Sequence, residues 1–221
     1  MIKETDKGVN CTNLFKAAYE NRYTWEHGFS GYKGKCAWSD GKRLIKGYFN
    51  LSKDLKASVK DISDENIHKA IFSQLWEVAI HRVRRSFEQT HGENTFTLGD
   101  ENEIGKEILV GGKNNGDKYR VKNNVVTMVR RHIHGKLIVI ETKEVLHTEK
   151  GYLSKSYSSQ YLDPTSKKDI KGKSFYKDDF RPLFKGGPWV LFSRSIEQES
   201  FEGIESSKQT FSFSSLNSLS N

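Results

Sequence analysis

The chain has 221 residues, of which 35% are hydrophobic and 12% aromatic, and its formal net charge is +8. This composition excludes a disordered chain, because it supplies enough core-forming side chains, and a mean hydropathy of −0.71 predicts a polar surface. The two cysteines, Cys11 and Cys36, lack the spacing of a disulfide framework or a zinc site. We therefore predict a globular fold without covalent or metal crosslinks.

The first predicted element is a helix that is capped by Asn10 or Thr12 and continues to Arg22 with one apolar face. Apolar and polar side chains then alternate, which predicts strands with one buried face. These strands are expected over residues 32–38, 44–50 and 55–59.

A second helix is the clearest element of the sequence. It opens at Ser63, places Asp64 and Glu65 at its positive end, and gathers basic residues at its negative end. Apolar residues recur at helical spacing, which predicts that one face is buried. These residues are Ile67, Ile71, Leu75, Val78 and Ala79.

Frequent turn residues separate short alternating segments from residue 87 onward. Asn123 and Asn124 predict a two-residue hairpin turn, because asparagine tolerates positive φ. Neighbouring strands are expected to pair antiparallel in sequence order. The expected strands cover residues 94–98, 107–110, 118–121, 125–129, 136–142 and 152–161.

The composition shifts to Ser, Asn and Gln after Ile196, which predicts a low-complexity tail over residues 201–221. We expect this tail to bury too little apolar surface to become ordered. Residues 1–12 are expected to be a flexible N-terminus and residues 13–200 a single α+β domain, built from an antiparallel meander sheet and two helices.

Three segments carry a resemblance to a known family: Asn13–Trp25 (NLFKAAYENRYTW), Ser86–Gly99 (SFEQTHGENTFTLG) and Ile108–Gly112 (ILVGG). Together they resemble a family of uncharacterised proteins from cyanobacteria and plastids, over about residues 13–196. The resemblance implies a photosynthetic source but no established activity.

The order of elements is also similar to the half-barrel of bacterial lipoprotein carriers. This likeness implies a curved antiparallel meander sheet wrapped around two helices, with a concave face that holds acyl chains. Fold alone does not determine function. The segment Trp189–Arg194 lacks the proline that we expect before its Ser-Arg pair, which puts the last strand in doubt.

The function we expect is that of a non-enzymatic accessory protein of photosynthetic cells, which binds a lipophilic ligand or an assembly partner. Large aromatic side chains can line an apolar cleft, although they also commonly fill a core. The residues expected to bind the ligand are Trp38, Phe72, Trp76, Phe87 and Tyr119. No cofactor is expected.

Arg82, Arg84 and Arg85 can face an anionic membrane or an acidic partner. Residues 1–10 do not resemble a signal peptide, and no apolar stretch has the length of a membrane span. We therefore expect a cytoplasmic protein, with peripheral contact to the thylakoid membrane as an option.

Nucleic acid is not the partner we expect. Tyr119, Tyr157 and Tyr161 interleave with basic residues, as in a stacking platform, but the same residues serve equally well in sheet packing.

The alternative function is an enzyme that acts on a hydrophobic small molecule through His91 and a carboxylate, with Glu88 as the candidate. No nucleophile stands at a recognisable spacing, so capping and turn formation are the favoured roles of these residues. A cleft in which His91 and Glu88 converge would favour the enzyme.

Metal binding is the other alternative that the residues raise. His132 and His134 would share one face of a strand and present two imidazoles. Arg130 and Arg131 stand beside them and repel a cation, so no metal site is expected.

Overall fold

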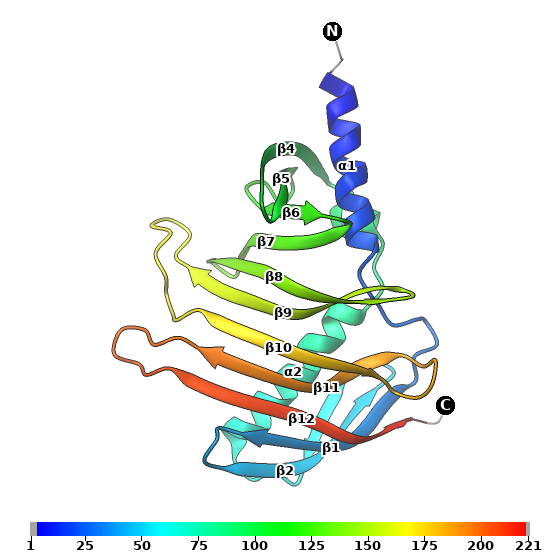
Figure 1. The fold of residues 1–221 in the computed structure, drawn as a ribbon, viewed down its shortest axis with the longest axis vertical. Helices are drawn as coiled ribbons and strands as arrows, with labels where there is room; N and C mark the ends of the chain where they lie inside the picture. Colours follow the sequence, from blue (N-terminus) through cyan, green and yellow to red (C-terminus); the bar gives the residue numbers. More distant parts are fainter. Residues whose placement is uncertain (1–3, 220–221) are drawn as a thin grey trace. The chain divides into compact units, whose positions relative to one another are not determined.

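The structure is a computed structural model that describes residues 4–219, with side chains from residue 10 onward. These residues hold twelve strands and three helices, and the strands pair antiparallel (Figure 1). The chain forms two compact units. Unit 1 comprises Met1–Tyr23, Arg85–Phe175 and Glu199–Ile204, and unit 2 comprises Thr24–Arg84, Tyr176–Gln198 and Glu205–Asn221.

Unit 1 is a meander of strands in the order β9-β8-β7-β6-β5-β4, so each strand pairs with its neighbour in sequence, as predicted. Asn123 and Asn124 have φ of 51° and 56°, which confirms the predicted hairpin turn between β6 and β7. The elements are α1 Glu4–Glu20, α3 Phe87–His91, β4 Asn94–Asn102, β5 Gly105–Gly112, β6 Lys118–Lys122, β7 Val125–Ile133, β8 Lys136–Thr148 and β9 Gly151–Leu162.

The core of unit 1 forms where α1 packs on β4, β6 and β7. Phe15 of α1 lies at its centre, and its ring is 4.4 Å from Tyr119 of β6 and 5.2 Å from Phe96 of β4, centroid to centroid. Cys11, Ala18 and Tyr19 recur at helical spacing and are buried with it. The apolar face of α1 is therefore covered by other residues of unit 1.

Unit 2 pairs early strands of the chain with its last strands in one sheet, in the order β10-β11-β12-β1-β2-β3. Trp38 of β1 stands opposite Phe211 of β12, and Cys36 stands opposite Phe213. The elements are β1 Gly31–Ser39, β2 Leu44–Ser52, β3 Ala57–Lys60, α2 Glu65–Arg82, β10 Ser174–Pro182, β11 Trp189–Gln198 and β12 Ser207–Ser218.

The predicted low-complexity tail is wrong as a description of residues 207–218, which form β12. Phe211 and Phe213 alternate with serines and are buried, and β12 hydrogen-bonds to strands on both sides. The serines lie on the opposite face, where a polar residue costs little. Residues 220–221 of the predicted tail lie outside the described residues.

Neither long helix begins at its predicted residue, and α2 begins at Glu65 instead of opening at Ser63. α1 begins at Glu4, so the predicted start at Asn10 or Thr12 is wrong and both residues lie within the helix. Residues 1–3 of the predicted flexible N-terminus lie outside the described residues. Asp64 caps α2, because its carboxylate accepts hydrogen bonds from the backbone amides of Asn66 and Ile67 at 3.0 and 3.2 Å.

The prediction of an antiparallel meander sheet with few helices is confirmed. The wrapping of one curved sheet around both helices stays a prediction, because α1 and α2 belong to different units. The single domain over residues 13–200 also stays a prediction. Among residues 4–219, no helix has the length and apolar character that a membrane span requires.

Candidate functional site

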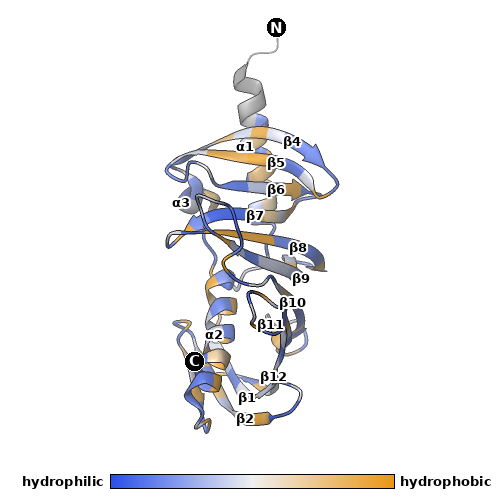
Figure 2. Ribbon diagram, turned by 90° about the vertical axis from the view of Figure 1, so that its left-hand side faces the viewer, coloured by the Kyte–Doolittle hydropathy of each residue, from blue (hydrophilic) through white to orange (hydrophobic). Residues whose placement is uncertain are grey.

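α2 has apolar residues on two sides, and only one of them faces the sheet of unit 2. The buried side carries Ile67, Ile71, Leu75, Val78 and Ala79, as the sequence predicts. These residues pack toward β1 and β3, which α2 contacts. Figure 2 shows the mixture of apolar and polar segments along this helix.

The second side of α2 is an apolar stripe open to solvent, formed by Phe72, Trp76 and Ile80 and called the outer stripe below. Their exposed fractions are 37%, 50% and 36%. Residues four apart lie above one another on a helix, and the rise of 1.5 Å per residue makes the stripe about 12 Å long. Isolated exposed apolar residues are common, but an aligned row of large ones is a feature of binding surfaces.

A buried ion pair fixes which side of α2 faces outward. Arg194 of β11 donates two hydrogen bonds of 2.7 Å to the carboxylate of Asp178 on β10, and both side chains are buried. Arg194 also donates to Gln74 Oε1 at 2.9 Å and lies 3.2 Å from Glu77 Oε1. Gln74 is two residues, or about 200°, from Trp76, so anchoring Gln74 to the sheet turns Trp76 away from it.

The two charges of this pair stabilise each other in a dry environment. Burial raises the pKa of the Asp178 carboxyl, and the guanidinium of Arg194 opposes that rise. Two parallel charge-assisted hydrogen bonds give the pair a fixed geometry. Its position between β10, β11 and α2 indicates a structural role in holding the helix.

The five predicted ligand residues fall in different environments. Phe72 and Trp76 belong to the outer stripe. Trp38 is buried in unit 2, where its Nε1 donates to Gln209 Oε1 at 2.9 Å. Phe87 and Tyr119 are buried in the aromatic core of unit 1, so the structure places them in packed protein.

Sequence reasoning missed Ile80 as a member of the stripe. Its spacing of four from Trp76, which is itself four from Phe72, was the available signal.

The three arginines predicted to contact an anionic membrane or an acidic partner lie in different environments. Arg84 and Arg85 are exposed. Arg82 is half-buried, and its guanidinium carbon lies 5.3 Å from the centroid of the Phe180 ring on β10. Arg82 therefore packs within unit 2, as a cation over an aromatic face.

His91 and Glu88 do not converge. His91 is buried, and its ring lies 5.0 Å from each of Phe15 and Tyr19. Burial, together with the positive charges of the nearby Arg131 and Arg22, lowers its pKa from 6.5 to about 4. Glu88 is exposed instead, and its Oε1 accepts from Lys16 Nζ at 2.5 Å. His91 is therefore a residue of the packed core, and Glu88 belongs to an ion pair on the surface.

The two histidines considered for a metal do not share a strand face. His132 lies near the end of β7, whereas His134 follows the strand at φ 49°, in the turn. The backbone amide of His132 donates to Asp117 Oδ1 at 3.0 Å. Among the residues whose side chains are described, no group of three His, Cys, Asp or Glu is arranged to hold a metal ion.

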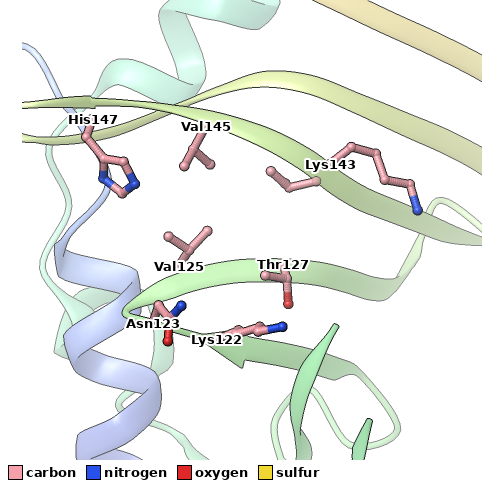
Figure 3. Close-up of a pocket in the computed structure, with 8 residues that line it drawn as sticks. Lys122, Asn123, Val125, Thr127, Lys143, Val145 and His147 are labelled. Carbon is pink, nitrogen blue, oxygen red and sulfur yellow. The ribbon is translucent and has the colours of Figure 1, made fainter. Parts of the chain in front are cut away.

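A hollow of about 190 Å³ lies in unit 1, where β7 and β8 diverge (Figure 3). The pairing of these strands ends at Met128 and Glu141, although β7 begins at Val125 and β8 continues to Thr148. The lining residues are Lys122, Asn123, Val125, Thr127, Thr142, Lys143, Val145 and His147.

Several polar groups of this hollow already have partners. Lys122 Nζ donates to the Glu103 carbonyl at 2.7 Å, and Lys143 Nζ pairs with Glu141 at 2.8 Å. Figure 3 shows Val125 and Val145 pointing toward each other across it. The volume is below the roughly 300 Å³ at which small-molecule sites begin. The hollow is thus a less promising site than the outer stripe.

Residues 6–219 match the family described as "Protein of unknown function (DUF3386)". No curated protein matches the chain. Several solved structures are similar at low levels, among them the following two. A LolA superfamily protein, NE2245 from Nitrosomonas europaea, is 7% identical with a TM-score of 0.37, over 96% of this chain and 94% of that one. A DUF1329 family protein from Desulfovibrio piger is 9% identical with a TM-score of 0.30, over 96% and 93%.

Proposed function

This chain is a member of the DUF3386 family, whose function is unknown, so we infer its role from its own side chains: we propose that it is a non-enzymatic protein that binds a lipophilic ligand. The observation that carries the proposal is the outer stripe of α2. Phe72, Trp76 and Ile80 stay exposed on a helix whose other apolar side already supplies the packing that unit 2 needs.

The physical argument is the cost of leaving this surface in water. Each large apolar side chain is stabilised by roughly 1.5–3 kcal/mol when fully buried, and the stripe forgoes part of that gain in the free protein. A ligand that covers all three residues recovers it. Phenylalanine and tryptophan offer broad, rigid faces to an acyl chain or an isoprenoid.

Charged groups near the stripe suit an amphiphilic ligand. Lys69 lies one turn before Phe72 and is exposed, with Glu65 3.6 Å from its Nζ. Arg84 follows the end of the helix and is exposed too. A carboxylate or phosphate head group can pair with either cation while the apolar part lies along the stripe.

The enzyme alternative receives no support from the geometry, because His91 is enclosed by aromatic rings and Glu88 is paired with Lys16. An assembly partner remains the other candidate occupant of the stripe, and the test below separates the two. The photosynthetic role, the cytoplasmic location and contact with thylakoids stay predictions from the sequence.

The test uses dansyl-labelled undecanoic acid as a probe, together with mass spectrometry of the native protein for bound lipid. We expect saturable binding to the wild type. Phe72→Ser with Trp76→Ser should weaken it by about tenfold or more, since two large apolar contacts are lost. The free energy of unfolding should change by less than about 1 kcal/mol, because both residues are exposed.

The matched control is Phe184→Ser. Phe184 is also in unit 2 and is 55% exposed, but it lies outside α2. It should leave probe binding unchanged. Equal weakening by the control, or a wild type that neither binds the probe nor carries lipid, would refute the proposal and leave the assembly partner as the occupant.

A further inference from the structure

The sheet of unit 2 carries a basic surface on the side opposite its buried core. Lys33 and Lys35 of β1, Lys46 of β2 and Lys60 of β3 form this surface, which we call the lysine face. All four are exposed. Their neighbours along each strand, such as Cys36 and Phe49, point the other way and are buried.

The strand register shows that the four lysines share one face. Lys35 and Lys60 both stand directly opposite Tyr48 of β2, one on each side of it. Lys46 is two residues from Tyr48, and Lys33 is two from Lys35, so all point the same way. Residues opposite each other have Cβ atoms about 5 Å apart, and diagonal neighbours about 7–8 Å. The charges are therefore close together.

The lysine face has no acidic counterpart. None of its four lysines takes part in an ion pair within the described part of the chain. The residues opposite Lys33 and Lys46 are Asn50 and Ala37. Some exposed lysines elsewhere do have acidic partners. Lys106, Lys113, Lys143 and Lys155 each lie within 4 Å of a glutamate.

Exposed apolar groups lie on the same face. Tyr48 is 52% exposed and Leu44, four residues before it on β2, is 61% exposed. Tyrosine favours the boundary between water and lipid, and leucine gains by entering the head-group region. A flat sheet face that combines unpaired lysines with such groups is complementary to an anionic bilayer.

We propose that the lysine face docks this protein onto an anionic membrane surface. This contact differs from the predicted one at Arg82, Arg84 and Arg85, and it stands independently of the outer stripe. Single-stranded nucleic acid is the less favoured polyanion, because stacking platforms present several aromatic side chains and this face exposes one. Leu44 also has no role in binding phosphates.

The experiment measures co-sedimentation of the full chain with vesicles of phosphatidylglycerol and phosphatidylcholine, and with phosphatidylcholine vesicles alone. We expect binding to the anionic vesicles only, and weakening with added salt because exposed charges are screened. Replacing all four residues, as K33Q/K35Q/K46Q/K60Q, should weaken binding by about a thousandfold. If that variant does not fold, K33Q/K35Q and K46Q/K60Q should each weaken binding by about thirtyfold.

The matched control is K106Q/K113Q/K143Q/K155Q, which removes an equal number of charges from lysines of unit 1 that each pair with a glutamate. It should bind anionic vesicles within about twofold of the wild type. An equal loss in both variants would show that net charge alone attracts the protein and would overturn the proposal. Binding of poly-uridine RNA through the four lysines, without vesicle binding, would overturn it in favour of nucleic acid.

Discussion

The two long helices differ in how much of their apolar surface their own unit covers. α1 of unit 1 presents one apolar face, and Cys11, Phe15, Ala18 and Tyr19 on it are all buried. α2 of unit 2 buries one side and leaves the outer stripe in solvent. The first helix has the pattern of a structural element, whereas the second has more apolar surface than packing requires.

Amphipathicity alone therefore does not identify a binding helix. Both helices carry apolar residues at helical spacing, and the distinction lies in which of them the sheet covers. Substitutions in the covered face should therefore cost stability, and substitutions in the outer stripe should cost binding.

The largest effect on stability should come from Phe15→Ala. Phe15 is fully buried and its ring contacts five other aromatic rings, so its removal leaves a cavity in unit 1. We expect a loss of about 3–5 kcal/mol in the free energy of unfolding, measured by urea denaturation. Phe72→Ala on α2 is the comparison and should cost less than about 1 kcal/mol. Similar losses of unfolding free energy in both variants would contradict the difference between the two helices.

Arg194→Leu should have the next largest effect, because it leaves Asp178 buried without its partner. We expect the free energy of unfolding to fall by about 3 kcal/mol. The dansyl-labelled probe should also bind the outer stripe more weakly, since α2 loses its hydrogen bond at Gln74. Adding Asp178→Leu removes the orphaned charge and should restore most of the stability. A double variant as unstable as Arg194→Leu would show that packing, not charge, dominates here.

The smallest expected effect is the change in unfolding free energy with pH that His91 contributes in the core of unit 1. The pKa of His91 is lowered to about 4 in the folded protein from 6.5. The unfolded chain therefore binds the proton first, so the contribution of His91 to stability is present above pH 6.5 and is lost as the pH falls toward 4. We expect a loss on the order of 2 kcal/mol across this window, seen in urea unfolding at several pH values.

His91→Phe is the control for this pH dependence. It keeps an aromatic ring among the surrounding aromatic side chains and removes the titrating group. Its unfolding free energy should decline less between pH 6.5 and pH 4 than that of the wild type. Identical slopes would assign the pH dependence to other groups.

Local chemistry made several elements predictable from the sequence. The start of α2 was predicted to within two residues, at Ser63, and Asp64 caps the helix because its carboxylate needs only the amides two and three residues ahead. Asn123 and Asn124 form a hairpin turn because their own backbone preference permits positive φ. The meander of unit 1 followed from strands that pair with their nearest neighbours. Each of these depends on residues close together in the chain.

Other features depended on partners far away in the chain. β12 becomes a strand because β1, some 180 residues earlier, pairs with it and its unit buries Phe211 and Phe213. The orientation of α2 also depends on a distant residue. Arg194 on β11 binds Gln74 on one side of the helix, and Trp76 on the other side faces solvent. The lysine face likewise exists only because the register aligns three strands. Local preferences were enough to locate α2, the Asn123-Asn124 turn and the strands of unit 1, since each depends on neighbouring residues. Which faces of these elements stay exposed, and whether residues 207–218 form a strand at all, depends on tertiary packing, because burial and pairing require partners from distant parts of the chain.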